Sequence, residues 1–534
     1  MFRKILAFGL SAAAVACLAT PGWSQEKPVV IYTRDNAPAA PKLDELPLKD
    51  SLSQYGMTWT FAKPARVGQF VNGDFYVVGV VTITAIAPRP LYGAEIPADQ
   101  LDPTDKEVRE KDRVRNGFMI NPPAEEKVAY DSGVKHFFDP ALVRKLPVSM
   151  KPGDCLVSTI SMPMGLALPV WLRNATEHRA ESDYSPVKDA AVLTCVAEPQ
   201  PLDAFRPAFC DRTQKIYLAR NLGRKLLPAV APQGDFPKLE KYIRLTQRPW
   251  VHTCFFGFEI PNDDMPGYGQ QIGECSGNCA LLLCCKYTPQ QKEPLLISFV
   301  QVGIDLGGMI RAGHPGWECW GGHGSGCKLP IFFAGLLLGD DELAHIHNSF
   351  PKAHFAEDEQ TAYGDCWTGA KVVFTGHSGI DEATGIGRNY ARTNDAWGPY
   401  EHIQPAKWVG GNWTSEAYRR ANTSAAWIGQ ALAIHLLRAE KVWNHDAFLD
   451  YVDRWMFEND APAIKTLAAL GHNYDQDWTR EGTCEWNRWH IAMWQTYRAT
   501  PGMPPTDGWK RQHDSSYYEN AIGKELKAPA RPGG

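Results

Sequence analysis

Hydrophobic and polar residues alternate in several short runs within the first part of the chain. The runs cover residues 57–62, 73–88, 154–163 and 190–199, and the last three end in proline. Period-two runs that are rich in β-branched and aromatic residues and are separated by turn residues predict antiparallel strands. We therefore expect an N-terminal antiparallel β-sandwich over residues 51–205, with the polar stretch 99–135 as an excursion from it.

After about residue 210 the spacing of the apolar residues becomes helical. The segment 444–460 shows this pattern, because its apolar residues fall near one stripe and its aspartates lie off that stripe. The stripe consists of Phe448, Leu449, Val452, Trp455 and Met456, and the aspartates are Asp446, Asp450 and Asp453. Further helices are expected at 268–287, 292–313, 328–350, 414–440, 462–473 and 484–502. Such helices pack as a bundle, a solenoid or a closed ring of helix pairs. The chain shows no residue-level repeat, which disfavours the solenoid, and we expect a toroid-like helical domain over 206–534.

The N-terminus has the pattern of a secretory signal peptide, with a basic start, a short apolar run and small residues before Ser24. We expect cleavage after residues 1–24, followed by an extended leader over 25–50 and a periplasmic or extracellular location. Cys17 also allows a lipid anchor, but Ala14 stands where a large aliphatic residue is usual. No later stretch reaches about 18 uninterrupted apolar residues, so no integral membrane segment is expected.

Composition narrows the function classes. The chain has 534 residues, 44% of them hydrophobic and 22% charged, with a formal net charge of −5. These values are typical of a folded protein and argue against a dedicated nucleic-acid binder, although they still allow a local basic patch. Twelve cysteines remain after the signal peptide, and this even number permits disulfides in an exported protein. The pair Cys319–Cys327 is a candidate staple, whereas Cys275 and Cys279, one helical turn apart, are expected in the core.

Three expected loops are unusually rich in aromatic and titratable residues, namely 313–330, 355–369 and 385–420. Eleven of the 18 tryptophans fall between residues 367 and 494. Long aromatic loops on a rigid scaffold are where binding sites usually lie. In the first loop, His323 stands between Gly322 and Gly324. Glycine lets a backbone approach a ligand closely, so this loop presents a titratable imidazole.

This combination resembles secreted (α/α)-toroid carbohydrate-active enzymes. The group includes glycoside hydrolases that carry a β-domain first, and polysaccharide lyases whose β-domain more often follows the toroid. The resemblance covers most of the chain at the level of architecture, and no signature motif transfers a catalytic residue. It implies a secreted polysaccharide-degrading enzyme, with a glycoside hydrolase slightly favoured because the β-domain comes first.

The residues themselves suggest how a glycan would be held and cleaved. Indole and phenol rings stack on the apolar faces of sugars, while charged and amide groups bind the hydroxyls. Hydrolysis usually needs two carboxyl groups across the scissile bond. Elimination across a uronic acid instead needs a Tyr or His to move protons and a group such as Arg, Asn or His to neutralise the sugar carboxylate. The candidate catalytic residues are His323, Asp395, Glu401, Asp358 and Tyr418. The candidate substrate-binding residues are Trp317, Trp320, Trp367, Trp397, Tyr400, Trp413, Arg419 and His252.

Three functions remain open at this point. The first is a glycoside hydrolase, the second is a polysaccharide lyase that acts on uronic-acid glycans through Tyr and His, and the third is a non-catalytic glycan-binding or surface-assembly protein. No cofactor is expected, with a structural calcium as the alternative because the loops are acidic. The expected partner in each case is a polysaccharide or an oligosaccharide.

Overall fold

The structure is a computed structural model that describes residues 29–100, 108–162, 186–251, 253, 265–267, 269–380, 397–474 and 485–525. The predicted signal peptide and two candidate site residues, His252 and Asp395, lie outside these ranges. Residues Ile31–Gly534 form one compact unit. The strand and helical parts therefore belong to the same compact unit. The domain boundary at residue 205 stays a prediction.

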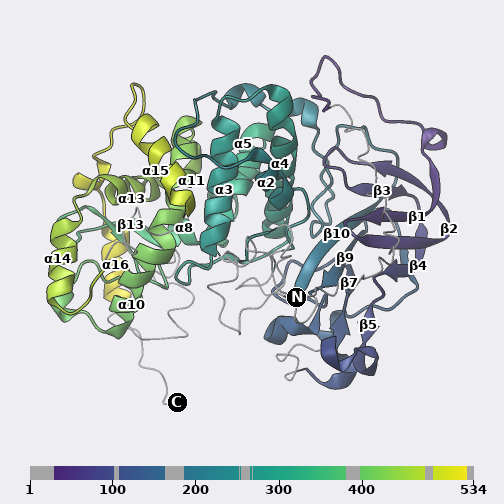
Figure 1. The fold of residues 1–534 in the computed structure, drawn as a ribbon, viewed down its shortest axis with the longest axis horizontal. Helices are drawn as coiled ribbons and strands as arrows, with labels where there is room; N and C mark the ends of the chain where they lie inside the picture. Colours follow the sequence, from purple (N-terminus) through teal and green to yellow (C-terminus); the bar gives the residue numbers. More distant parts are fainter. Residues whose placement is uncertain are drawn as a thin grey trace, which may run out of the picture. The chain divides into compact units, whose positions relative to one another are not determined.

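The N-terminal part of this unit is a strand-rich, nearly barrel-shaped sheet, shown in purple and blue in Figure 1. Its strand order is β7-β9-β10-β3-β2-β4-β8, and β1 pairs with β2. The strands are β1 (Leu48–Gln54), β2 (Met57–Gln69), β3 (Phe75–Val78), β4 (Val81–Ala87), β7 (Phe118–Ile120), β8 (Val148–Met150), β9 (Cys155–Ser161) and β10 (Val187–Val196). A separate pair, β5 (Leu91–Tyr92) and β6 (Val114–Arg115), lies within the polar stretch.

The predicted strand-rich region is confirmed as one eight-stranded sheet, the β-sandwich stays an expectation, and the strand directions need one correction. All pairs in the sheet are antiparallel except β10 and β3, which run parallel, so the sheet is mixed. The alternation seen in the sequence places Trp59 and Phe61 on the buried face, at 0% and 6% exposure. The indole N–H of Trp59 donates to Ser158 Oγ at 2.9 Å, which satisfies its one polar group inside the sheet.

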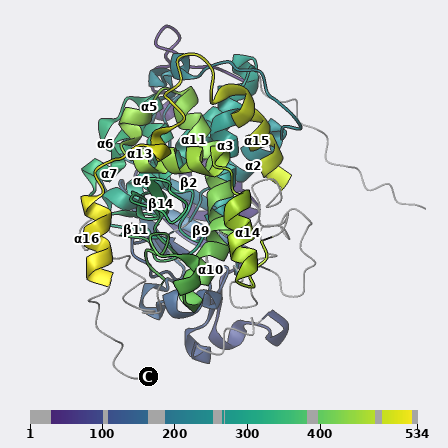
Figure 2. The same cartoon turned by 90° about the vertical axis from the view of Figure 1, so that its left-hand side faces the viewer.

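The C-terminal part is mainly helical, as predicted, while the toroid stays an expectation. The helix α3 packs against α11, α4 against α5 and α2, and α11 also against α15 and α13. Figures 1 and 2 both show α3 beside α11. The longer helices are α2 (Leu239–Thr246), α3 (Gly269–Cys284), α4 (Pro289–Arg311), α5 (Lys328–Leu338), α10 (Gly410–Tyr418), α11 (Ser424–Leu436), α13 (Asp446–Phe457), α14 (Ala461–Ala469), α15 (Glu485–Tyr497) and α16 (Ser516–Glu525). Short elements fill the connections: α6 (Asp341–Ala344), α7 (Ile346–Ser349), α8 (Ala356–Glu359), α12 (Glu440–Trp443), β11 (Gly316–Trp317), β12 (His354–Phe355), β13 (Thr361–Tyr363) and β14 (Val372–Phe374).

The helix α13 tests the predicted stripe directly. Phe448, Leu449 and Val452 are buried as expected. Asp453 was expected off the buried stripe, and this is wrong, because its carboxylate is buried against the Arg498 guanidinium at 2.5 Å. A partner on a neighbouring segment therefore allows an acid to face the core.

The strand and helical parts share a buried ion triad. The Nε of Arg206 contacts Asp74 Oδ2 at 2.5 Å, and Nη1 contacts Asp305 Oδ1 at 2.9 Å. Asp74 precedes β3 and Asp305 lies on α4, and all three side chains are buried. Because a buried charge is stable only with its partners, this triad fixes the strand part against α4.

One helix among the described residues, α4, is long and apolar enough to cross a membrane. Its apolar window is 94% buried inside the protein, as in a core helix. The described part of the chain therefore shows no clear integral membrane segment.

Candidate functional site

The glycine-rich segment 313–330 is held by a short acidic run, residues 357–360, in and just after α8. Three side chains of the run bind backbone groups of the segment between β11 and α5, so this part keeps a defined path without regular secondary structure of its own. These contacts are Gly326 N to Glu357 Oε1 at 2.7 Å, Cys319 N to Glu359 Oε2 at 2.9 Å and Gln360 Nε2 to Gly321 O at 2.8 Å.

The remaining member of the run, Asp358, binds a side chain at the end of the segment. Its two carboxylate oxygens lie 2.5 and 2.7 Å from the ammonium of Lys328, and both residues are buried. Burial alone raises the pKa of Asp358, but the charge of Lys328 and the hydrogen bond from His347 bring this pKa well below its usual range. Asp358 is thus ionised and paired, which gives it a structural role. These contacts do not test its predicted catalytic role.

Glu357 is the unusual member of the acidic run. It is 0% exposed, and its Oε2 has no hydrogen-bond partner among the described residues. Burial raises the pKa of this carboxyl to about 7, although the hydrogen bond from Gly326 N lowers it. The protonated form is therefore favoured inside the fold up to near-neutral pH.

Four of the predicted site residues lie around an imidazole that was not predicted, that of His377. The ring of His377 lies 4.7 Å from Trp320, 4.3 Å from Trp397 and 4.5 Å from Tyr418, each in an edge-to-face arrangement. The two indoles are stacked on each other at 5.3 Å with 13° between their planes. His323 is close enough for its charge to act on His377. We call these five residues the His377 cluster.

The electrostatics of the cluster favour neutral imidazole at its centre. His377 is 3% exposed, and its Nδ1 has no hydrogen-bond partner among the described residues. Burial, followed by the positive charge of His323, lowers the pKa of His377 to about 3. The other four members are only partly buried. A buried imidazole with a strongly lowered pKa beside partly buried titratable groups makes the cluster a candidate functional site.

Backbone contacts from three segments position the cluster. The N–H of His377 donates to Ser415 Oγ on α10 at 3.1 Å, and its carbonyl accepts from Gly321 N at 3.0 Å. The N–H of Ser378 donates to the Trp397 carbonyl at 3.0 Å. Gly321 has φ +59°, and a Cβ there would lie 2.5 Å from the Tyr418 ring. Only glycine fits at this crossing, which explains why this loop is rich in glycine.

Glu401, a predicted catalytic residue, lies in a buried ion pair. Glu401 is 0% exposed and forms a two-pronged pair with Arg454, at 2.7 and 2.9 Å, while Phe374 N donates to the same carboxylate at 2.6 Å. Its partners therefore give Glu401 a structural role, and its predicted catalytic role remains untested.

Arg419 and Tyr400 belong to the same buried network. Arg419 pairs with Glu416 through two contacts of 2.8 Å, and the hydroxyl of Tyr400 donates to Glu416 at 2.6 Å. Arg419 begins a π-helical turn, Arg419–Thr423, that directly follows α10. Both of these predicted substrate-binding residues are buried, at 5% and 0% exposure, and their charged or polar ends are engaged by Glu416.

The remaining predicted aromatic residues lie in other surroundings. Trp367 and Trp413 both pack against Trp408, at 6.1 and 4.9 Å, and Trp413 stacks on His472 at 3.6 Å. Trp317 is 1% exposed and packs against His314 at 4.9 Å, so it is part of the core. The tryptophans thus form at least two groups rather than one continuous surface.

The predicted staple is wrong. All ten described cysteines are free and buried, including Cys319 and Cys327. The acidic run holds the glycine-rich segment in place of a disulfide. Among the described residues, no three His, Cys, Asp or Glu side chains are placed to hold a metal ion.

His377 had a sequence signal of the same kind as His323. It stands in the stretch Gly376-His377-Ser378-Gly379, again with glycines close on both sides. The stretch contains no tryptophan and no acid, so its local pattern does not predict a site. Only the fold shows that it meets the other glycine-rich loop.

Comparison with known proteins found no family for this chain. No family model matches the chain, and neither a curated protein nor a solved structure matches it.

Proposed function

We propose that the protein is a secreted enzyme that cleaves an acidic polysaccharide by β-elimination at the His377 cluster. The observation that carries this proposal is the meeting of Trp320, Trp397, His323 and Tyr418 around a neutral, buried imidazole. The resemblance to (α/α)-toroid carbohydrate-active enzymes supports a glycan-cleaving enzyme, and the choice of elimination over hydrolysis rests on the cluster.

Each part of the cluster matches a requirement of elimination. The stacked indoles of Trp320 and Trp397 offer aromatic surface for the C–H face of a sugar ring. His323 accepts the C5 proton of a uronate, and the freed electron pair forms the C4–C5 double bond while the C4–O bond breaks. Tyr418 donates its hydroxyl proton to the departing oxygen. His377 stays neutral behind them, so that the site does not carry two charged imidazoles.

The carboxylates support elimination over hydrolysis. Hydrolysis requires two carboxyl groups that face the scissile bond. Asp358 and Glu401 are the predicted catalytic carboxylates that the structure describes, and each is committed to a buried cation. Asp395 lies outside the described residues and takes no part in this comparison.

A substrate panel tests the proposal. The mature protein is incubated with neutral and uronic polysaccharides while reducing ends and the ultraviolet absorbance of unsaturated products are followed together. We expect both signals to rise with a uronic substrate. Reducing ends without absorbance would reassign the reaction to hydrolysis. Binding without either signal would leave a non-catalytic glycan-binding protein.

A matched pair of tyrosine variants tests the site. Tyr418→Phe removes only the hydroxyl that donates the proton, and we expect turnover to fall about 10²-fold or more. Tyr497→Phe removes a hydroxyl that donates to the Ala231 carbonyl at 2.6 Å, outside the cluster. Equal turnover of the two variants would exclude Tyr418 from the reaction.

A further inference from the structure

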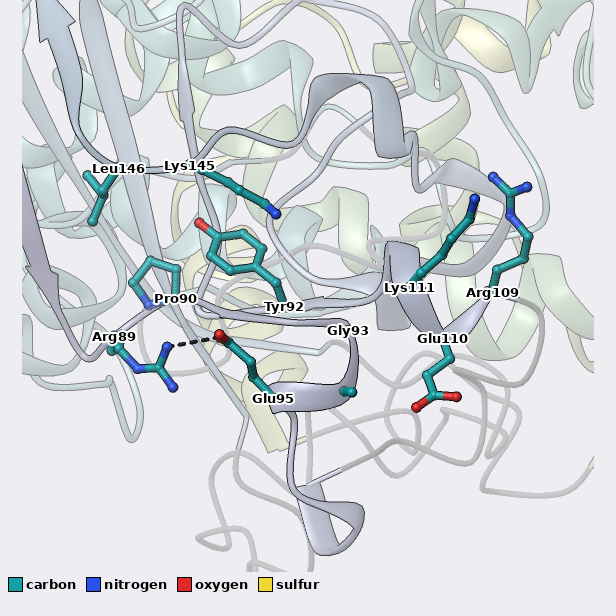
Figure 3. Close-up of a pocket in the computed structure, with 11 residues that line it drawn as sticks. Arg89, Pro90, Tyr92, Gly93, Glu95, Arg109, Glu110, Lys111, Lys145 and Leu146 are labelled. Carbon is teal, nitrogen blue, oxygen red and sulfur yellow. Dashed lines mark hydrogen bonds and ion pairs between the residues drawn. The ribbon is translucent and has the colours of Figure 1, made fainter.

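The strand part of the protein carries a pocket that shares no residue with the His377 cluster. It has a volume of about 920 Å³ and is lined by residues 89–90, 92–95, 109–111 and 145–146. Figure 3 shows side chains of all three segments around the same hollow. A pocket of this size lies in the range of small-ligand sites.

Specific contacts hold the three segments in place. The hydroxyl of Tyr92 donates to the Arg144 carbonyl at 2.8 Å, which fixes the segment that contains Lys145. Gly93 N donates to the Arg113 carbonyl at 2.9 Å, and β5 pairs with β6 in register. Burial raises the pKa of Tyr92 to about 12, so its ring remains a neutral phenol.

The charges that line the pocket are predominantly positive. The lining contains four basic residues and two acidic ones, and Asp112 pairs with one of the arginines from outside the lining, which leaves a surplus of one positive charge on a chain whose formal net charge is −5. The pairs Arg89–Glu95 and Arg109–Asp112, at 2.9 and 2.6 Å, occupy both arginines.

Two lysines are the cations of the pocket that remain available to a ligand. No carboxylate of the described residues pairs with Lys111 or Lys145. The Nζ of Lys145 lies 5.2 Å from the centre of the Tyr92 ring, which fixes its position by a cation–π contact. In Figure 3 the carboxylate of Glu110 points away from the ammonium of Lys111, which leaves this cation unopposed.

We propose that this pocket is a non-catalytic docking site for a uronate-containing segment of an acidic polysaccharide. Lys111 and Lys145 bind the sugar carboxylates as point charges, and Tyr92 adds apolar ring surface for the C–H groups of a sugar. The preference for an anion rests on the pocket itself, and the choice of a glycan as its carrier rests on the proposed function.

A double variant with a matched control tests the pocket. The affinity of a soluble oligogalacturonate is measured by calorimetry for the full mature chain, for Lys111→Gln/Lys145→Gln and for Lys49→Gln/Lys63→Gln. Lys49 and Lys63 are exposed lysines of the sheet outside the pocket. We expect the pocket variant to bind at least about tenfold more weakly and to lose part of the salt dependence, because two charge-assisted contacts disappear. The control variant should bind like the unaltered chain.

Two further ligands define the chemistry. The methyl-esterified oligomer, which is neutral, should bind much more weakly than the acid. A short single-stranded DNA of similar charge should bind more weakly as well. Equal affinity of the two double variants, of the ester or of the DNA would overturn the proposal.

This test is separable from the proposed catalysis. Lys-dependent binding by a chain that yields no unsaturated product would support the pocket and contradict the elimination. If short oligomers yield unsaturated product but the lysine substitutions leave binding unchanged, the elimination is supported and the pocket proposal is contradicted.

Discussion

Two buried polar regions both take residues from α10 and its C-terminal end, and they differ in how their charges are satisfied. In the ion network, Glu401, Glu416, Arg419 and Arg454 are all buried and each has a charged partner. In the His377 cluster, the buried group is neutral and its Nδ1 has no hydrogen-bond partner among the described residues. Buried charges that pair with each other are not available to a ligand, whereas an unpaired polar atom is. This difference supports the proposal that the His377 cluster is the functional site.

The two regions meet within single turns of the chain. Ser415 binds the backbone of His377, and the next residue, Glu416, binds Arg419. Tyr418 contacts His377, and the residue after it belongs to the ion network. The network therefore fixes α10, and through α10 it fixes Tyr418.

The largest expected effect breaks the ion network. Arg454→Ala removes the two-pronged partner of the buried Glu401 carboxylate and leaves it only Arg419, whose Nε lies 3.7 Å away, so we expect a loss of about 3 kcal/mol in the free energy of unfolding. Urea denaturation measures this loss. The control is Arg511→Ala, which removes an exposed pair with Asp507 and should cost less than about 1 kcal/mol. Similar losses in both variants would contradict the assigned role of the network.

The second effect falls on the cluster and should leave stability nearly unchanged. His323→Ala removes the proposed base, and we expect turnover to fall by about 10²-fold or more. The comparison is His345→Ala, a half-buried histidine at the end of α6. Turnover of the uronic substrate is measured for both variants, and unfolding curves compare their stabilities. Unchanged turnover of a folded His323→Ala protein would refute the assignment.

The third effect uses pH to test the acidic run. Because the pKa of Glu357 is raised from 4.5 to about 7, its stabilising contribution is present below pH 4.5 and is lost as the pH rises towards 7. Glu357→Gln keeps a neutral side chain at every pH. We expect the variant to gain about 3 kcal/mol of stability relative to the unaltered protein between pH 4.5 and 8.

The difference between the two proteins is the quantity to measure in that experiment. Asp453, whose pKa burial also raises to about 7, is present in both and cancels from it. Unfolding curves at several pH values provide the difference directly. Parallel stability profiles would show that Glu357 is ionised throughout this range.

The smallest effect compares the two groups of tryptophans. Trp320→Leu removes one stacking surface of the cluster, and we expect KM to rise about three- to tenfold, the value of one aromatic contact. Trp413→Leu removes a ring that stacks on His472 outside the cluster, and KM should stay the same. Equal changes in both would mean that the substrate reaches both groups.

Local pattern predicted much of the fold and part of the candidate site. Period-two runs predicted the strands β2, β3, β4, β9 and β10, because alternation follows directly from a half-buried sheet. The short strands β7 and β8 were not predicted, since three residues carry too little pattern. Trp320, His323, Trp397 and Tyr418 were predicted as site residues, and the structure places all four around one imidazole.

What the sequence could not predict depended on distant partners. Asp358 and Glu401 looked like free loop carboxylates because Lys328 and Arg454 lie 30 and 53 positions away. His377 was missed because its neighbours come from three other segments. The choice between a reactive and a structural acid is made by tertiary pairing, which local spacing does not encode.

The acidic run 357–360 has a consequence for protein engineering. Four consecutive side chains each hold a different point of the glycine-rich segment, so a deletion or insertion of one residue in either stretch misaligns all the contacts at once. The glycine-rich segment that carries His323 therefore depends on the acidic run for its shape. Grafted into another scaffold without its acidic counterpart, it would lose the anchors that define its shape.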